Sequence, residues 1–161
     1  MSRARCRRAL LLLLGACLLL ATAAAQEQGA TAPLRETLDR HLQAIQARDL
    51  EALMATVTDG EALTLILPNG KVLTTREEFR QLHVDWFAED DWRMRFQVRQ
   101  VRAFGDTGIA LVHYLSQQRQ HDGSYATRRE ALLSLVFARE QGEWRLVYDQ
   151  NTVVPPAPTQ Q

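Results

Sequence analysis

The chain has 161 residues, of which 19 are basic, 19 are acidic and 46% are hydrophobic. This length gives one domain and leaves no room for a second sizeable core. The zero net charge argues against nucleic acid as a partner, and the hydrophobic content argues against wholesale disorder.

The first 25 residues have the layout of a secretory signal peptide. Four arginines within residues 1–8 precede an apolar run from Ala9 to Ala25 that ends in small residues. This order predicts cleavage after Ala25, or near Ala23, and a periplasmic or secreted protein. An uncleaved membrane anchor is the alternative, because the run of 17 residues approaches the length of a short span.

The cysteines raise a second alternative for the N-terminus, which is lipidation of Cys17. The stretch Leu14-Gly15-Ala16-Cys17 loosely matches a bacterial lipoprotein box, but the apolar residues that follow Cys17 disfavour this interpretation. Cleavage would remove both Cys6 and Cys17, so we expect a mature domain without a disulfide. It would also leave 15 basic and 19 acidic side chains, a formal charge of −4, and no membrane span.

Two helices are expected after a small, polar linker over residues 26–33. The apolar positions of the first helix recur every three or four residues, at Leu34, Leu38, Leu42 and Ile45. This helix is expected to end near Arg48. Asp49 is a suitable N-cap for a second short helix, which Asp59 and Gly60 interrupt.

A short strand, a turn and a third helix follow. Residues 62–67 are typical of a strand, and residues 68–71 of a turn into Val72 and Leu73. Thr75 and Glu78 have the spacing of a capping box, which predicts the start of the third helix. Its apolar face would contain Phe79, Leu82, Trp86 and Phe87.

The remainder changes from helical to alternating periodicity, which indicates strands. Glycine-containing turns divide it into four strands, at residues 92–104, 109–119, 125–139 and 143–152. Residues 154–161 are rich in proline and are expected to form a disordered tail. The predicted fold class is therefore α+β, with three N-terminal helices on one face of a curved antiparallel sheet whose edge the short strand joins.

This order of elements resembles the nuclear transport factor 2-like superfamily, which includes ketosteroid isomerases and polyketide-cyclase-like proteins. The segments that carry the resemblance are "ARDLEALMATV", "VRAFGDTGIALVHY" and "REQGEWRLVYDQNT". It covers residues 34–153 and is strongest toward small exported bacterial members of unknown function. The resemblance implies a cone-shaped fold with a pocket between sheet and helices, and a homodimer through the outer face of the sheet.

The resemblance does not carry over the catalytic groups of ketosteroid isomerase. The tyrosine of that family falls at His41, its proton-shuttling carboxylate at or near Leu67, and its oxyanion-holding acid near Ser134. No acid lies between Leu65 and Pro68, so no general base is available there. The isomerase interpretation is therefore disfavoured.

Polar side chains of the expected pocket are the remaining candidates for a site. Alternation directs either His113 or Tyr114 into the cavity, and Arg128 and Glu130 could pair on the cavity side. Gln150 occupies a position where related proteins often carry a histidine. The candidate ligand-pocket residues are His41, Trp86, His113, Glu130, Ser134 and Gln150.

No metal site is expected, because the four histidines lack the spacing of metal ligands, and no cofactor motif is present. We therefore predict an exported, non-catalytic domain that binds a small hydrophobic or amphipathic molecule in an apolar pocket. The first alternative is a cyclase-, dehydratase- or isomerase-like enzyme that uses His41, His113 or Glu130. A second is a dimerisation or adaptor module whose pocket is filled by side chains.

Overall fold

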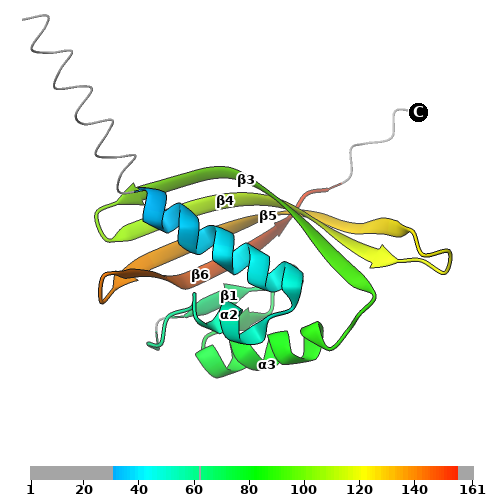
Figure 1. Cartoon of the computed structure of the whole chain (residues 1–161), viewed down its shortest axis with the longest axis horizontal. Helices are drawn as coiled ribbons and strands as arrows, with labels where there is room; N and C mark the ends of the chain where they lie inside the picture. Colours follow the sequence, from blue (N-terminus) through cyan, green and yellow to red (C-terminus); the bar gives the residue numbers. More distant parts are fainter. Residues whose placement is uncertain (1–30, 62, 156–161) are drawn as a thin grey trace, which may run out of the picture.

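The structure is a computed structural model that describes residues 31–61 and 63–155. The predicted signal peptide, Cys17 and most of the predicted tail lie outside the described residues. The chain folds as a mixed α+β domain with one curved, six-stranded sheet (Figure 1). No helix within the described ranges is both long and apolar enough to cross a membrane.

The sheet is built around an antiparallel meander of four long strands, as the alternating periodicity predicted. These are β3 (Trp92–Phe104), β4 (Thr107–Arg119), β5 (Tyr125–Glu140) and β6 (Glu143–Val153). The short strand β1 (Thr64–Ile66) pairs in parallel with β6, and β2 (Val72–Leu73) pairs antiparallel with β1. The strand order is therefore β2-β1-β6-β5-β4-β3.

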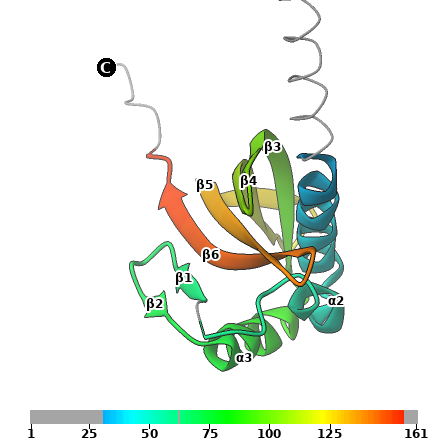
Figure 2. The same ribbon diagram turned by 90° about the vertical axis from the view of Figure 1, so that its left-hand side faces the viewer.

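The N-terminal helix, described over residues 31–47, crosses the concave face of the sheet (Figures 1 and 2). Its four periodic apolar residues are buried, which confirms the predicted stripe: Leu34, Leu38, Leu42 and Ile45. Residues 31–33, which the sequence assigned to the linker, are helical. This segment is held against the sheet, because Leu34 is fully buried and lies so close to Gly108 that a Cβ there would meet its side chain at 2.7 Å.

Two further helices begin at the predicted caps. In α2 (Leu50–Met54), the N-cap Asp49 accepts a hydrogen bond of 3.0 Å from the Ala52 amide. In α3 (Arg76–Phe87), Thr75 and Glu78 form the predicted capping box. Arg76 donates to the carbonyl oxygens of Met54, Val57 and Thr58 at 2.7–3.0 Å, which fixes the start of α3 beneath the sheet.

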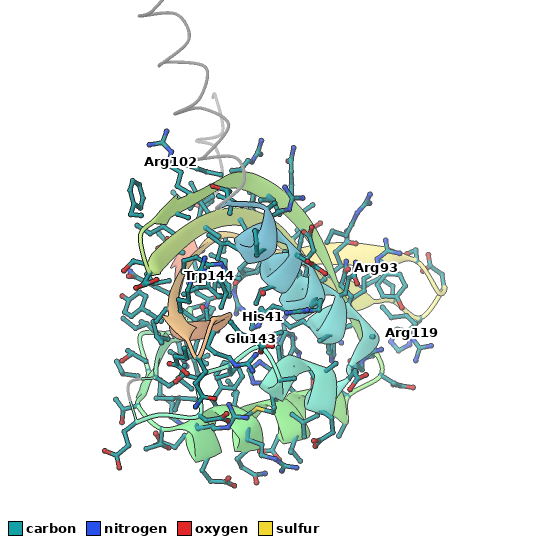
Figure 3. All side chains as sticks on the ribbon, turned by 60° about the vertical axis from the view of Figure 1, so that its left-hand side comes forward. His41, Arg93, Arg102, Arg119, Glu143 and Trp144 are labelled. Atoms are coloured by element: carbon teal, nitrogen blue, oxygen red, sulfur yellow. The ribbon has the colours of Figure 1, made fainter. Side chains whose placement is uncertain are left out.

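Side chains from the helices and from the concave face share one core. Trp144, Phe137 and Leu146 extend from the sheet and are almost completely buried beneath the N-terminal helix. In Figure 3, Trp144 and His41 lie inside the curve of the sheet, whereas Arg102 extends from its outer face. The outer face is convex, and on β4 it presents Ile109, Leu111 and His113.

Strand pairing is irregular at three places, and two of them, in β6 and β5, decide which residues face the cavity. Phe137 pairs with Leu146 and Val136 pairs with Tyr148, so Val147 is an extra residue in β6. Ser116 pairs with Arg129 and Gln117 pairs with Thr127, so Arg128 is an extra residue in β5. Such bulges reverse the facing of every residue beyond them.

Candidate pocket on the concave face

A cavity of about 330 Å³ lies between α3, β1 and the concave face of the long strands. The core does not fill it, although the apolar residues around it are partly or fully buried. This volume is at the lower end of the range usual for small-molecule sites.

Aromatic side chains form one wall of the cavity. Trp86 from α3 stacks on Trp92 from β3, with ring centroids 4.4 Å apart and an angle of 23° between the planes. The Trp92 indole N–H donates a hydrogen bond of 3.0 Å to the Trp86 carbonyl oxygen, which holds the two rings in place. Phe96 extends the wall along β3 and meets Tyr114 edge to face. The Arg48 guanidinium lies 4.3 Å from the centroid of the Trp92 ring, so contacts within the protein hold this aromatic wall in place.

Asp149 from β6 is the buried acid of the cavity. It is only 7% exposed, and burial raises the pKa of its carboxyl to about 8. Oδ1 accepts a hydrogen bond of 3.3 Å from Asn151 Nδ2, and no hydrogen bond to Oδ2 is formed within the described ranges. Near neutral pH, Asp149 is therefore mostly a neutral carboxylic acid that can donate a proton into an apolar space.

Tyr114 and Asn151 form a fixed polar pair beside Asp149. The Tyr114 hydroxyl donates a hydrogen bond of 2.8 Å to Asn151 Oδ1, and Asn151 Nδ2 also donates to the Ile66 carbonyl oxygen at 3.1 Å. Burial raises the pKa of the Tyr114 hydroxyl, an effect that the nearby Arg129 guanidinium opposes. The phenol remains protonated near neutral pH, and its oxygen can still accept a hydrogen bond.

Two neutral histidines lie on this side of the sheet. His83 lines the cavity, and its Nδ1 donates to the Phe79 carbonyl oxygen at 2.8 Å. His41 is fully buried in the core, and its Nδ1 donates to Thr56 Oγ1 at 2.8 Å, since that hydroxyl itself donates to Leu53. Burial lowers the pKa of His83 to about 4 and that of His41 to about 3, and each histidine is therefore uncharged at neutral pH.

Of the six predicted pocket residues, Trp86 lines the cavity. His41 is packed in the adjacent core rather than in the cavity lining. The other four belong to the convex face, because they alternate with buried concave residues: His113, Glu130, Ser134 and Gln150.

On the convex face, the predicted residues bind one another or their neighbours. His113 Nε2 donates to Glu130 Oε1 at 2.7 Å, and the Tyr148 hydroxyl donates to Gln150 Oε1 at 2.6 Å. The pair expected between Arg128 and Glu130 is not formed, because the bulge turns Arg128 into the cavity lining, where it donates to Gln118 Oε1.

The predicted pocket residues do not include the polar residues that line the cavity: His83, Glu89, Tyr114, Ser116, Gln118, Arg128, Arg129, Asp149 and Asn151. Arg128 was expected on the cavity side as a possible partner of Glu130, and it does line the cavity. Tyr114 was one of two alternatives for a single inward position, and the structure directs it inward. Asp149 was missed because strict alternation from the buried Trp144 and Leu146 would direct Gln150 inward, and the bulge at Val147 reverses this. The sequence offered one signal for it, which is an aspartate within a strand whose preceding inward residues are apolar.

The described residues contain no group of three or more side chains arranged to hold a metal ion.

A family model described as a SnoaL-like domain matches residues 34–155. No curated protein matches the chain.

Solved structures of several bacterial proteins share the fold. One is a ketosteroid isomerase-like protein from Erwinia carotovora atroseptica, with 14% identity, a TM-score of 0.65, and coverage of 78% of this chain and 97% of that chain. A dehydratase candidate of the NTF2-like family from Streptomyces avermitilis has 16% identity, a TM-score of 0.67, and coverage of 80% and 98%. An NTF2-like protein with a cystatin-like fold from Novosphingobium aromaticivorans has 19% identity, a TM-score of 0.66, and coverage of 88% and 90%. At these identities the likeness establishes the fold alone, which agrees with the expected nuclear transport factor 2-like architecture.

Proposed function

Because the chain belongs to the family of SnoaL-like domains, whose fold can serve either ligand binding or catalysis, we propose that it binds a small amphipathic molecule in the concave pocket. The observation that carries this proposal is Asp149, a neutral carboxylic acid in a cavity with an aromatic wall. An acid group is costly to bury without full hydrogen bonding, and its retention there is typical of a functional site.

The two sides of the pocket suit the two parts of such a ligand. A ring system fits against the wall of Trp86, Trp92 and Phe96, where burial of apolar surface and aromatic contacts stabilise it. A carbonyl or hydroxyl oxygen of the ligand can accept a hydrogen bond from the protonated carboxyl of Asp149. Asn151 holds that carboxyl in position through its hydrogen bond to Oδ1.

Calorimetric titration with 2-naphthylacetamide, a neutral probe with one aromatic and one carbonyl group, tests the proposal. We expect saturable binding at one site in the wild-type protein. Ser116→Trp, which fills the cavity from β4, should abolish binding, and Met94→Trp repeats the test from β3. Ser134→Trp is the matched control, because it adds the same side chain to the convex face. Absence of binding, or equal loss in the Ser134 variant, would overturn the proposal.

A second candidate function, proton-transfer catalysis, is favoured by the same carboxyl. A pKa of about 8 lets Asp149 both release and accept a proton near neutral pH, which general acid–base catalysis requires. An isomerase-, dehydratase- or cyclase-like reaction at a carbon next to a carbonyl would use Asp149 as its general acid or base.

Exchange of the α-protons of 2-tetralone in D2O, followed by proton NMR, tests this candidate. The carboxylate form of Asp149 would take a proton from the α-carbon, which gives an enolate and a protonated carboxyl. That carboxyl proton exchanges with D2O, and the enolate carbon then takes up a deuteron, which restores the ketone and the carboxylate. We expect the wild-type protein to accelerate exchange and Asp149→Asn to lose the acceleration. Equal rates with and without wild-type protein would exclude the reaction for this probe.

We further propose export, with residues 1–25 as a cleaved signal peptide. The basic, apolar and small-residue segments of the sequence support it. Intact-mass measurement of protein from the native host should give a chain that begins at Gln26, or close to it. A mass that retains residues 1–25, or one that carries lipid on Cys17, would contradict cleavage at this position.

We also propose that the convex face forms a homodimer. Ile109 is 43% exposed on this face and lies beside the half-buried Leu111, so burial against a second copy would be favourable. Native mass spectrometry should show a dimer that Ile109→Glu dissociates. A wild-type monomer would refute this arrangement.

A further inference from the structure

We infer that the occupant of the concave pocket is an amphipathic carboxylate, whose anionic head binds Arg128 and Arg129 while its ring packs against the Trp86–Trp92 pair. This inference rests on the proposed function, because it names the chemical class that the pocket takes.

The bulge in β5 directs two consecutive arginines into one pocket. In a regular strand, neighbouring side chains point to opposite faces, so only one of Arg128 and Arg129 could line the cavity. Because Arg128 is the extra residue between the pairs Ser116–Arg129 and Gln117–Thr127, both side chains line it. The bulge therefore places two positive charges in the pocket, where a regular strand would place one.

Neither arginine is neutralised by a carboxylate of the described chain. Arg128 donates to the neutral amide oxygen of Gln118 at 3.0 Å, and Arg129 lies beside the Tyr114 hydroxyl. Six other arginines in the described ranges do form salt bridges with acids: Arg35, Arg76, Arg80, Arg119, Arg139 and Arg145. The two pocket arginines thus have neutral hydrogen-bond partners but no carboxylate partner within the described residues.

The charge of the lining fits a single negative charge on the ligand. Glu89 and Asp149 are the acids that line the cavity, and Asp149 is mostly neutral near neutral pH. The two guanidinium groups therefore outnumber the one remaining acid of the lining, Glu89. A monoanion would balance the pocket, and the planar fork of arginine matches the two oxygens of a carboxylate.

The aromatic wall and the two arginines line the same cavity, where the wall suits an apolar ring and the arginines suit an anionic group of the same ligand. The Trp86–Trp92 pair offers an aromatic contact surface to a ring, and Arg128 and Arg129 offer hydrogen-bond donors to oxygen anions. A ring that carries a short carboxylate arm satisfies both sets of contacts at once. Charge-assisted hydrogen bonds of this kind contribute more than neutral ones, so an acid should bind more tightly than its amide.

Calorimetric titration with 2-naphthylacetate and 2-naphthylacetamide at neutral pH tests the inference, because the two probes differ in charge and share the ring. We expect the wild-type protein to bind the acid about tenfold more tightly than the amide. The double variant Arg128→Gln, Arg129→Gln should lose this preference and keep its affinity for the amide. Arg102→Gln, on the convex face beside Ile109, is the matched control and should leave both affinities unchanged.

The outcomes separate the inference from the proposed function. Equal affinity of the wild-type protein for both probes, or a preference that survives in the double variant, would overturn the carboxylate inference while the pocket itself stands. Failure of both probes to bind would overturn the inference and the proposed function together. A charge-retaining variant, Arg128→Lys with Arg129→Lys, should keep part of the preference, and its complete loss there would contradict the electrostatic explanation.

Discussion

Asp149→Asn tests the electrostatics of the pocket. Burial raises the pKa of the Asp149 carboxyl from its ordinary value of 3.8 to about 8. Between these two pH values, the folded protein holds a proton that the unfolded chain releases. The free energy of unfolding therefore falls as the pH rises through this window, by about 1.4 kcal/mol per pH unit for one group.

The asparagine variant removes this titration and keeps the shape of the side chain. All other titrating groups are common to both proteins, so they cancel when the two free energies are subtracted. We expect the stability of the wild-type protein relative to Asp149→Asn to fall by about 3 kcal/mol between about pH 5 and about pH 7.

Urea denaturation of both proteins across this pH range measures the difference. Equal slopes of free energy against urea in the two proteins would establish that the same cooperative transition is compared. Parallel pH profiles for wild type and variant would refute the assignment of a neutral carboxylic acid to Asp149.

Three further predictions concern stability. Trp144→Ala should lower the free energy of unfolding by about 3–5 kcal/mol, because it empties the centre of the core, and an unchanged melting temperature would contradict this. The low pKa values of His41 and His83, about 3 and about 4, mean that stability should be lost as the pH falls below about 6.5, where the unfolded chain takes up protons first. Thermal melts should show this loss reduced in His83→Asn, and an identical acid profile in that variant would argue against it. Thr75→Ala should cost about 1 kcal/mol through loss of the capping box, whereas Thr74→Ala, the matched control, should cost less; equal losses would count against the cap.

Local chemistry made much of the fold predictable. The cap residues Asp49 and Thr75 mark helix starts because their side chains accept amide hydrogen bonds that the helix leaves unpaired. The four long strands follow from strict alternation and from turns that contain glycine. The parallel pairing of β1 with β6 brings together residues far apart in the sequence, and no local pattern encodes it.

The site was less predictable because two single-residue bulges control it. Without the bulge at Val147, alternation would direct Gln150 inward, and Asp149 would face outward. Without the bulge at Arg128, the two arginines would lie on opposite faces. Periodicity predicts which residues of a strand share a face. A single inserted residue exchanges the inward and outward positions beyond it, and the composition of the strand does not reveal this change.

The same physics explains why His113 and Glu130 form a pair outside the pocket. They share the convex face, where His113 donates to the Glu130 carboxylate. Their closeness alone would have suggested acid–base chemistry. Burial, which adapts a carboxyl to such chemistry by raising its pKa, is present at Asp149, whereas the Glu130 side chain is half exposed.

A crystal structure of the protein with 2-naphthylacetate bound tests the account most directly. We predict the naphthalene ring against Trp86 and Trp92, with the carboxylate oxygens within hydrogen-bond distance of the Arg128 and Arg129 guanidinium groups. A probe bound on the convex face near His113, with the concave cavity left unoccupied, would contradict the assignment of the binding site.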